Sequence, residues 1–278
     1  MSVNWYPGHM RRTRRTIREH LRLCDGAFEV LDARVPEASR NPDLAELLGC
    51  LPRVVVLNKA DLADPVATRR WVELFSRQGY PAVPVQARDG RGIQELVRHM
   101  RQVLQEADRV PQGRLPRVMV VGIPNVGKSA LINALAARHV APTGRRPGIT
   151  RGKMWIRVGP HFELLDTPGI LWPRLGDVEV GYKLAAVGAI KDEVLPAEKV
   201  VLWLISWLAV HYPRCLQERY GISGVPGDDM LRRIAHRRGL LLAGGEPDEE
   251  RAALAVLKDL REGRLGRITL DLPGEFGG

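Results

Sequence analysis

The sequence has few cysteines, few aromatic residues and no long hydrophobic run. Its 278 residues include only Cys24, Cys50 and Cys215, and no Cys-x-x-Cys pair. A disulfide framework or a cysteine-rich zinc site is therefore not expected, and a reducing compartment fits. The longest apolar run, residues 200–210, is too short to cross a bilayer and predicts a core helix. The polar, arginine-rich N-terminus does not predict a secretory signal.

Acidic residues are outnumbered by basic ones. The chain has 42 Lys and Arg against 32 Asp and Glu, a formal net charge of +10. This excess favours a polyanionic partner, with nucleic acid ahead of a membrane, although a generally basic surface would give the same charge. A helical pattern at residues 9–23 has six arginines and one acid, Glu19. That helix is either a solvated face or a contact for a phosphate backbone.

Apolar patterns in the first part of the chain alternate between strand and helix. We predict strands at residues 28–33, 53–57, 82–87 and 118–121, helices at 65–79, 93–106 and 130–137, and a hairpin at 153–165. This alternation is typical of an α/β fold with a doubly wound, mostly parallel sheet. Residues 36–42 are predicted to be a loop.

The strand signals almost vanish after residue 173. Helical patterns follow at residues 178–190, 197–211, 228–237 and 248–262. We therefore predict a first domain over residues 1–176 and a small helical domain over residues 177–278. The apolar stripe of the second of these helices is expected to be core. The arginines around residues 232–238 form a basic helix end that can bind phosphate.

Residues 122–129, GIPNVGKS, have the pattern of a P-loop between a predicted strand and a predicted helix. The glycines allow backbone N–H groups to surround phosphate oxygens, and the helix dipole favours the negative charge. Lys128 is expected to reach the β- and γ-phosphates, and Ser129 to ligate magnesium. The remaining phosphate-binding positions predicted here are Pro124, Asn125, Val126, Gly127 and Ala130.

Residues 58–61, NKAD, follow a predicted strand and fit a guanine site. Asp61 can accept hydrogen bonds from guanine N1–H and the exocyclic amine, a donor pair that adenine lacks. Lys59 is expected to pack its stem along the base and ribose, and Asn58 completes the motif. Taken alone, the segment is also compatible with an ordinary loop in which Asp61 caps a helix.

Residues 166–169, DTPG, follow the predicted hairpin. Asp166 is placed for magnesium, and the Gly169 N–H for the γ-phosphate, so this loop is expected to sense that phosphate. Taken alone, the segment also reads as a plain turn. Because it directly precedes the helical domain, its ordering by GTP is expected to reorient that domain.

The order of these motifs is unusual, because Asn58 precedes Gly122 by 64 residues. Ras-like GTPases have the guanine motif after the P-loop, so this order resembles that of circularly permuted GTPases. The segments WYPGHM (5–10), DARVP (32–36), SRNP (39–42) and GAIKD (188–192) narrow the resemblance to the ribosome biogenesis GTPase A family. The similarity covers most of the chain and weakens after about residue 213.

This resemblance implies a cytoplasmic GTPase that hydrolyses GTP to GDP and phosphate with Mg²⁺ and assists late maturation of the large ribosomal subunit. Its helical domain is expected to contact ribosomal RNA. We expect no membrane contact, and we expect the protein to be a monomer. A GTP-dependent RNA-binding switch without turnover is the alternative, and an unrelated P-loop ATPase is disfavoured by Asn58 and Asp61.

The resemblance also assigns individual residues. Thr150, in the switch I match at residues 147–150, is implied as the second magnesium ligand. Gln86 and Ala87 are expected to be nucleotide-binding residues, with the Ala87 N–H offered to guanine O6. Gln86 and Arg88 depart from the family's Ser-Ala-Lys pattern. Asn125 matches an asparagine of potassium-stimulated relatives. Two roles of Asn125 are therefore compatible with the sequence: binding K⁺ beside the phosphates, or making a local hydrogen bond in the turn.

The position after residue 169 holds Ile170, where Ras-like enzymes have the glutamine that orients water. Isoleucine cannot hydrogen-bond water, so slow intrinsic hydrolysis is expected. The resemblance points to His9 as the group that orients or deprotonates water near neutral pH. The predicted catalytic set is therefore His9, Lys128, Thr150 and Gly169.

Overall fold

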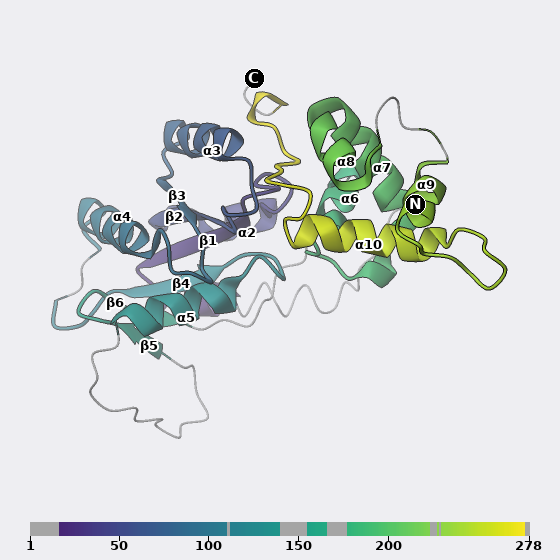
Figure 1. Ribbon diagram of the computed structural model, residues 1–278. Coiled ribbons are helices and arrows are strands. Elements are labelled where there is room, and N and C mark those ends of the chain that lie inside the picture. Colours follow the sequence, from purple (N-terminus) through teal and green to yellow (C-terminus); the bar gives the residue numbers. More distant parts are fainter. Residues whose placement is uncertain are drawn as a thin grey trace.

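The computed structural model describes residues 17–109, 112–139, 155–165, 177–222, 227 and 229–275. Within these residues, six strands form one sheet in the order β3-β2-β1-β4-β6-β5 (Figure 1). The strands are β1 (Gly26–Asp32), β2 (Arg53–Asn58), β3 (Ala82–Val85), β4 (Arg117–Val121), β5 (Trp155–Val158) and β6 (Phe162–Leu165). All neighbours pair in parallel except β5 and β6. The predicted mostly parallel sheet is confirmed.

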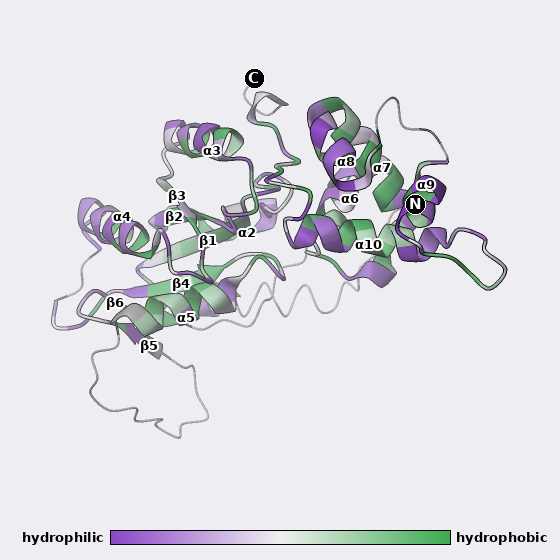
Figure 2. Ribbon diagram, viewed as in Figure 1, coloured by the Kyte–Doolittle hydropathy of each residue, from purple (hydrophilic) through white to green (hydrophobic). Residues whose placement is uncertain are grey.

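Helices cover both faces of the sheet. Successive side chains of a strand point to opposite faces, so the apolar strands present apolar side chains on both faces, and helices bury them. On one face, Phe28 and Val30 share a core with α4 (Ile93–Glu106) and α5 (Lys128–His139). On the other face, Leu31 packs with α3 (Pro65–Arg77). In Figure 2, α3 and α4 carry both hydrophilic and hydrophobic residues, as expected for helices with one face on a sheet.

Two helices that begin with proline were not predicted. Helix α2 (Pro42–Leu48) begins where we expected a loop to end, and α8 (Pro213–Tyr220) directly follows α7 (Ala197–His211). Proline suits the first helical position because its missing N–H has no partner there and its φ is already helical. At α2, the Asn41 side chain also accepts the Asp43 N–H at 2.9 Å. The prediction of a loop at Pro42 was wrong for this reason.

The second part of the chain is helical, as predicted. It contains α6 (Val178–Ala186), η1 (Asp192–Val194), α7 (Ala197–His211), α8, α9 (Met230–Arg237) and α10 (Glu249–Arg261). The predicted apolar stripe of α7 is buried, which confirms its place in the core. None of the described helices is long and apolar enough to span a membrane. The division of the chain at residue 176 stays a prediction.

After α10 the chain runs back to the sheet (Figure 1). We call residues 268–271 the return segment; η2 (Pro273–Glu275) follows it. The Ile268 N–H donates to the Leu62 carbonyl at 3.1 Å, and the Leu270 N–H to the Arg34 carbonyl at 2.7 Å. Trp71 of α3 donates its indole N–H to the Asp271 carbonyl at 2.9 Å. The last described part of the chain thus contacts the loops after β1 and β2.

Candidate functional site

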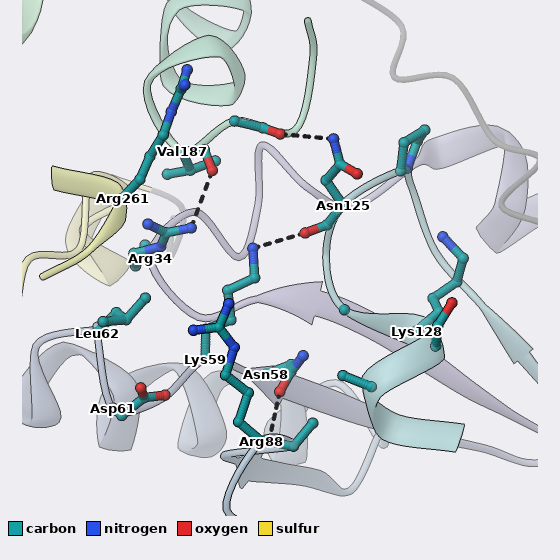
Figure 3. Close-up of a pocket in the computed structure, with 16 residues that line it drawn as sticks. Arg34, Asn58, Lys59, Asp61, Leu62, Arg88, Asn125, Lys128, Val187 and Arg261 are labelled. Carbon is teal, nitrogen blue, oxygen red and sulfur yellow. Dashed lines mark hydrogen bonds between the residues drawn. The ribbon is translucent and has the colours of Figure 1, made fainter. Parts of the chain in front are cut away.

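A cavity of 870 Å³ lies at the carboxyl ends of the parallel strands (Figure 3). Ligands of open α/β sheets bind at this edge. Register brings the loops together, because Asp32 at the end of β1 pairs with Asn58 at the end of β2. The predicted residues that line the cavity are Asn58, Lys59, Asp61, Ala87, Pro124, Asn125, Gly127, Lys128, Ser129 and Ala130.

The predicted P-loop forms a tight turn between β4 and α5. The Lys128 Nζ donates to the carbonyls of Gly122 at 3.0 Å and Ile123 at 2.7 Å, which holds the ammonium over the loop. Burial lowers the pKa of Lys128 to about 8. Gly127 has φ +97°, and a Cβ there would lie 2.2 Å from the Asn58 Nδ2. Only glycine therefore fits where the P-loop meets the guanine motif.

The predicted guanine motif is bonded to the P-loop. The Asn58 Nδ2 donates to the Val126 carbonyl at 2.8 Å, and its Oδ1 accepts the Ala87 N–H at 3.2 Å. The Lys59 Nζ donates to the Asn125 carbonyl at 2.7 Å. Two segments far apart in sequence thus form one site, in which Asp61 lines the same cavity.

Several predicted residues are elsewhere. Gln86 does not line the cavity; its N–H donates to the Arg91 carbonyl at 3.0 Å. The Val126 side chain is fully buried, and its contribution is the carbonyl bound by Asn58. The predicted residues that lie outside the described part of the chain are His9, Thr150, Asp166 and Gly169, together with Ile170.

Sequence reasoning gave no site role to several residues of the cavity wall, which are Arg34, Leu62, Arg88, Val187, Gly188 and Arg261. Arg34 and Gly188 fall in the DARVP and GAIKD segments. Those segments carried the family resemblance without indicating a role. No local pattern distinguished Arg261, which arrives from α10 in the helical domain.

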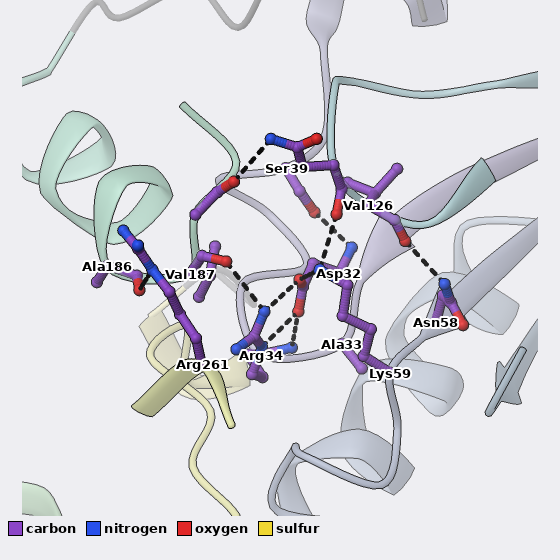
Figure 4. Close-up of polar contacts among 12 residues, drawn as sticks. Asp32, Ala33, Arg34, Ser39, Asn58, Lys59, Val126, Ala186, Val187 and Arg261 are labelled. Carbon is purple, nitrogen blue, oxygen red and sulfur yellow. Dashed lines mark hydrogen bonds and ion pairs between the residues drawn. The ribbon is translucent and has the colours of Figure 1, made fainter. Parts of the chain in front are cut away.

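Arg34 belongs to a buried ionic network beside the cavity (Figure 4). Its Nε and Nη2 donate to the two carboxylate oxygens of Asp32 at 2.9 and 2.7 Å. The Lys59 Nζ lies 2.8 Å from the same carboxylate. Burial alone would raise the pKa of Asp32, but the charges and hydrogen bonds of Arg34 and Lys59 outweigh it and hold that pKa well below its usual value.

The C-terminal end of α6 forms the opposite wall, and four successive carbonyls there accept side-chain donors. Arg261 donates to the carbonyls of Ala185 at 2.7 Å and Ala186 at 3.2 Å. Arg34 donates to the carbonyl of residue 187 at 3.2 Å, and Asn125 donates from its Nδ2 to that of residue 188 at 3.0 Å. The helical domain is therefore part of the cavity and is bonded to both of the loops that face it.

Comparisons with known proteins agree with this geometry. The family model described as 50S ribosome-binding GTPase matches residues 117–219. A ribosome biogenesis GTPase A from Priestia megaterium is 44% identical, over 99% of this chain and 98% of the relative. The GNP-bound YlqF crystal structure from T. maritima is 29% identical with a TM-score of 0.67, covering 94% of this chain and 98% of that chain. A GDP-bound YlqF structure has the same TM-score and 28% identity, covering 93% and 99%. The chain belongs to the ribosome biogenesis GTPase A family and is a GTP hydrolase with the circularly permuted P-loop fold.

Proposed function

We propose that this chain binds the maturing large ribosomal subunit and hydrolyses GTP during late assembly in the cytoplasm. The main observation in support of the GTP site is that the P-loop and the NKAD segment line one cavity, with Lys128 and Asp61 both on its wall. The names of the relatives and of the matching family support the ribosomal role. The net charge of +10 suits a partner made of RNA.

The described residues divide the work of binding. Asp61 accepts the paired donors of guanine, and Lys59 packs its stem along the base and ribose. The P-loop N–H groups and the Lys128 ammonium hold the phosphates, with the positive end of α5 facing them. Among the described residues, Lys128 is held by neutral carbonyls alone, so its positive charge is available to a phosphate.

Magnesium fits the donor set at the start of α5. Ser129 lines the cavity there and offers a hydroxyl oxygen, the kind of ligand that Mg²⁺ prefers. Thr150 and Asp166 are proposed as the further ligands, and K⁺ beside Asn125 as a possible second ion. When bound, Mg²⁺ neutralises charge on the phosphate oxygens. His9 is proposed to orient the attacking water, since Ile170 cannot.

The first experiment measures hydrolysis of GTP and ATP in potassium buffer, with and without large ribosomal subunits, for wild type and His9→Ala. We expect GTP-selective turnover that rises with subunits and falls in the variant. GTP turnover that large subunits leave unchanged would contradict the ribosomal proposal, and full stimulation of His9→Ala would contradict the role of the histidine.

Base recognition is tested separately with Asp61→Asn. An amide matches xanthine better than guanine, so preference should shift toward xanthosine triphosphate by about 1–3 kcal/mol. Asp64→Asn is the matched control, because Asp64 does not line the cavity and caps α3 through its carboxylate. Equal GTP affinity of wild type and Asp61→Asn would contradict the guanine assignment.

A further inference from the structure

The Asp32–Arg34 ion pair is almost completely buried, and its contribution to the stability of the fold does not explain this burial. Both residues are only 1% exposed. Removing two charges from water is costly, and an apolar pair of similar volume is often equally stabilising. Arg34 lines the nucleotide cavity and Asp32 lies directly behind it, so the pair is better explained by the groups that it holds in place. Its contacts identify two such groups, one on each side.

The first group is Lys59. The Lys59 backbone has φ +60°. The Lys59 Nζ lies between the Asn125 carbonyl at 2.7 Å and the Asp32 carboxylate at 2.8 Å. The two acceptors keep the side chain across the cavity, although it is 25% exposed. Both bonds are charge-assisted through the Lys59 ammonium, and only Asp32 adds an acceptor of opposite charge.

The second group is the helical domain. The Arg34 Nη2 that binds Asp32 also donates to the Val187 carbonyl at the end of α6. The carbonyl of Arg34 accepts the Leu270 N–H of the return segment at 2.7 Å. One residue is thus bonded to the helical half of the chain by both its side chain and its backbone. Figure 4 shows Asp32 between Lys59 on one side and Arg34 on the other, with Val187 beyond Arg34.

We propose that Asp32 and Arg34 are positioning residues of the GTPase, which hold Lys59 against the nucleotide and the end of α6 against the cavity as one unit. Nucleotide binding and the placement of α6 then depend on each other through this pair. The inference rests on the proposed GTP site but does not depend on the ribosomal role. It adds a link between nucleotide and helical domain that is separate from the loop at residues 166–169.

A double-mutant cycle tests the action through Lys59. Asp32→Asn should raise KM for GTP about tenfold with kcat within about twofold, because it weakens binding of substrate and transition state alike. Lys59→Met should raise KM by at least as much. The double variant should be no worse than Lys59→Met alone, since Asp32 acts through a group that is then missing.

Hydrogen exchange of residues 178–188 tests the link to α6. In wild type, GDP should slow exchange in this segment by about tenfold or more. In Arg34→Lys, which keeps the charge but cannot span both Asp32 and Val187, this GDP-dependent protection should be lost while GDP still binds. Protection that persists in Arg34→Lys would overturn the link. Arg34→Lys keeps the positive charge beside Asp32 and is therefore expected to fold. It tests the proposal even if Asp32→Asn does not fold.

Asp259→Asn is the matched control. Asp259 is 0% exposed and is held by an arginine through two bonds, as Asp32 is. Arg219 does not line the cavity, whereas Arg34 and Lys59 do. Its KM for GTP should equal that of wild type. Additive effects of Asp32→Asn and Lys59→Met, or an equal rise in KM in Asp259→Asn, would overturn the proposal. Failure of wild type to bind GTP would instead overturn the proposed nucleotide site.

Discussion

Two buried carboxylates, Asp32 and Asp259, are each surrounded by cations, and they differ in what those cations touch. Asp259 receives Arg219 at 2.8 and 3.1 Å, Arg238 at 2.9 Å, and Arg264. These three side chains are 30%, 32% and 38% exposed. Around Asp32, by contrast, the Arg34 side chain is 2% exposed and Lys59 faces the nucleotide cavity.

The difference teaches how to distinguish an ion cluster that holds the fold from one that serves the site. Within the described part of the chain, the side-chain partners of Asp259 lie within residues 219–264, and they join α8, the end of α9 and the end of α10. Burial raises the pKa of Asp259, but the hydrogen bonds of Arg219, Arg264 and Tyr220 lower it to about 2. The Asp32 carboxylate instead pairs with Arg34 and Lys59, and Arg34 in turn donates to the Val187 carbonyl in the other half of the chain. The donor–acceptor distances at the two carboxylates are similar, so the locations of the partners distinguish the two clusters.

The largest expected effect comes from removing each carboxylate. Asp259→Ala should lose about 3 kcal/mol of unfolding free energy, because three guanidinium groups lose their counter-charge. GDP at a hundredfold its Kd should still stabilise this variant by about 2.7 kcal/mol, as in wild type. In Asp32→Ala at the same GDP concentration, that increment should shrink by about 1.4 kcal/mol, the equivalent of tenfold weaker binding.

Urea unfolding with and without GDP measures both quantities. Thermal melts at matched GDP concentrations serve as the check on two-state behaviour. A loss of the GDP increment in Asp259→Ala that matches the loss in Asp32→Ala would remove the distinction between the two clusters.

A pH titration sharpens the comparison, because the cavity contains a group that titrates near 8. Lys128 must be charged to hold phosphate, so GDP affinity should be full below its pKa and fall about tenfold between pH 7 and 9. The nucleotide-free protein should gain stability between pH 8 and 10.5, where the unfolded chain binds a proton that the folded chain does not. Calorimetry in buffers of different ionisation enthalpy should show proton uptake on binding at pH 8.5. The same pH dependence in Lys128→Met would contradict this assignment.

The smallest effect is expected at a bond between the two halves of the chain that bypasses Asp32 and Arg34. The Tyr212 hydroxyl donates to the Asp64 carboxylate at 3.0 Å. Tyr212→Phe should lose about 1 kcal/mol of stability and leave KM for GTP unchanged, as measured by urea unfolding and steady-state kinetics. A raised KM would show that any contact between the halves affects the site.

The sequence was sufficient to predict the parts of the site whose residues are contiguous in the chain. The strand, turn and helix around Lys128, and the segment that carries Asn58 and Asp61, could be predicted because their chemistry depends on neighbours in the chain. The parallel sheet followed from alternation of apolar runs. Their meeting in one cavity depends on the pairing of β1 with β2 and with β4.

The rest depends on contacts that no local pattern encodes. Arg34 and Val187 are 153 residues apart. The basic helix end at α9 shows the reverse problem, since its charges suggested a phosphate site. In the structure, Arg232 pairs with Glu249, Arg237 donates to the Tyr220 carbonyl, and Arg238 pairs with Asp259. Two of these arginines are therefore paired with carboxylates of α10, which the local sequence does not indicate, and phosphate binding at this helix end stays a prediction.

The return segment has a consequence for how the protein is made. The Ala38 N–H and the Ala33 carbonyl are bonded to Asp271 and Thr269, which lie 233 and 236 residues later. A translating ribosome releases the nucleotide-binding loops long before it adds the residues that tie them down. The newly made chain therefore cannot complete the surroundings of Arg34 until residue 271 has emerged. The surroundings of the GTP site are therefore completed only after the whole helical part of the chain has been made.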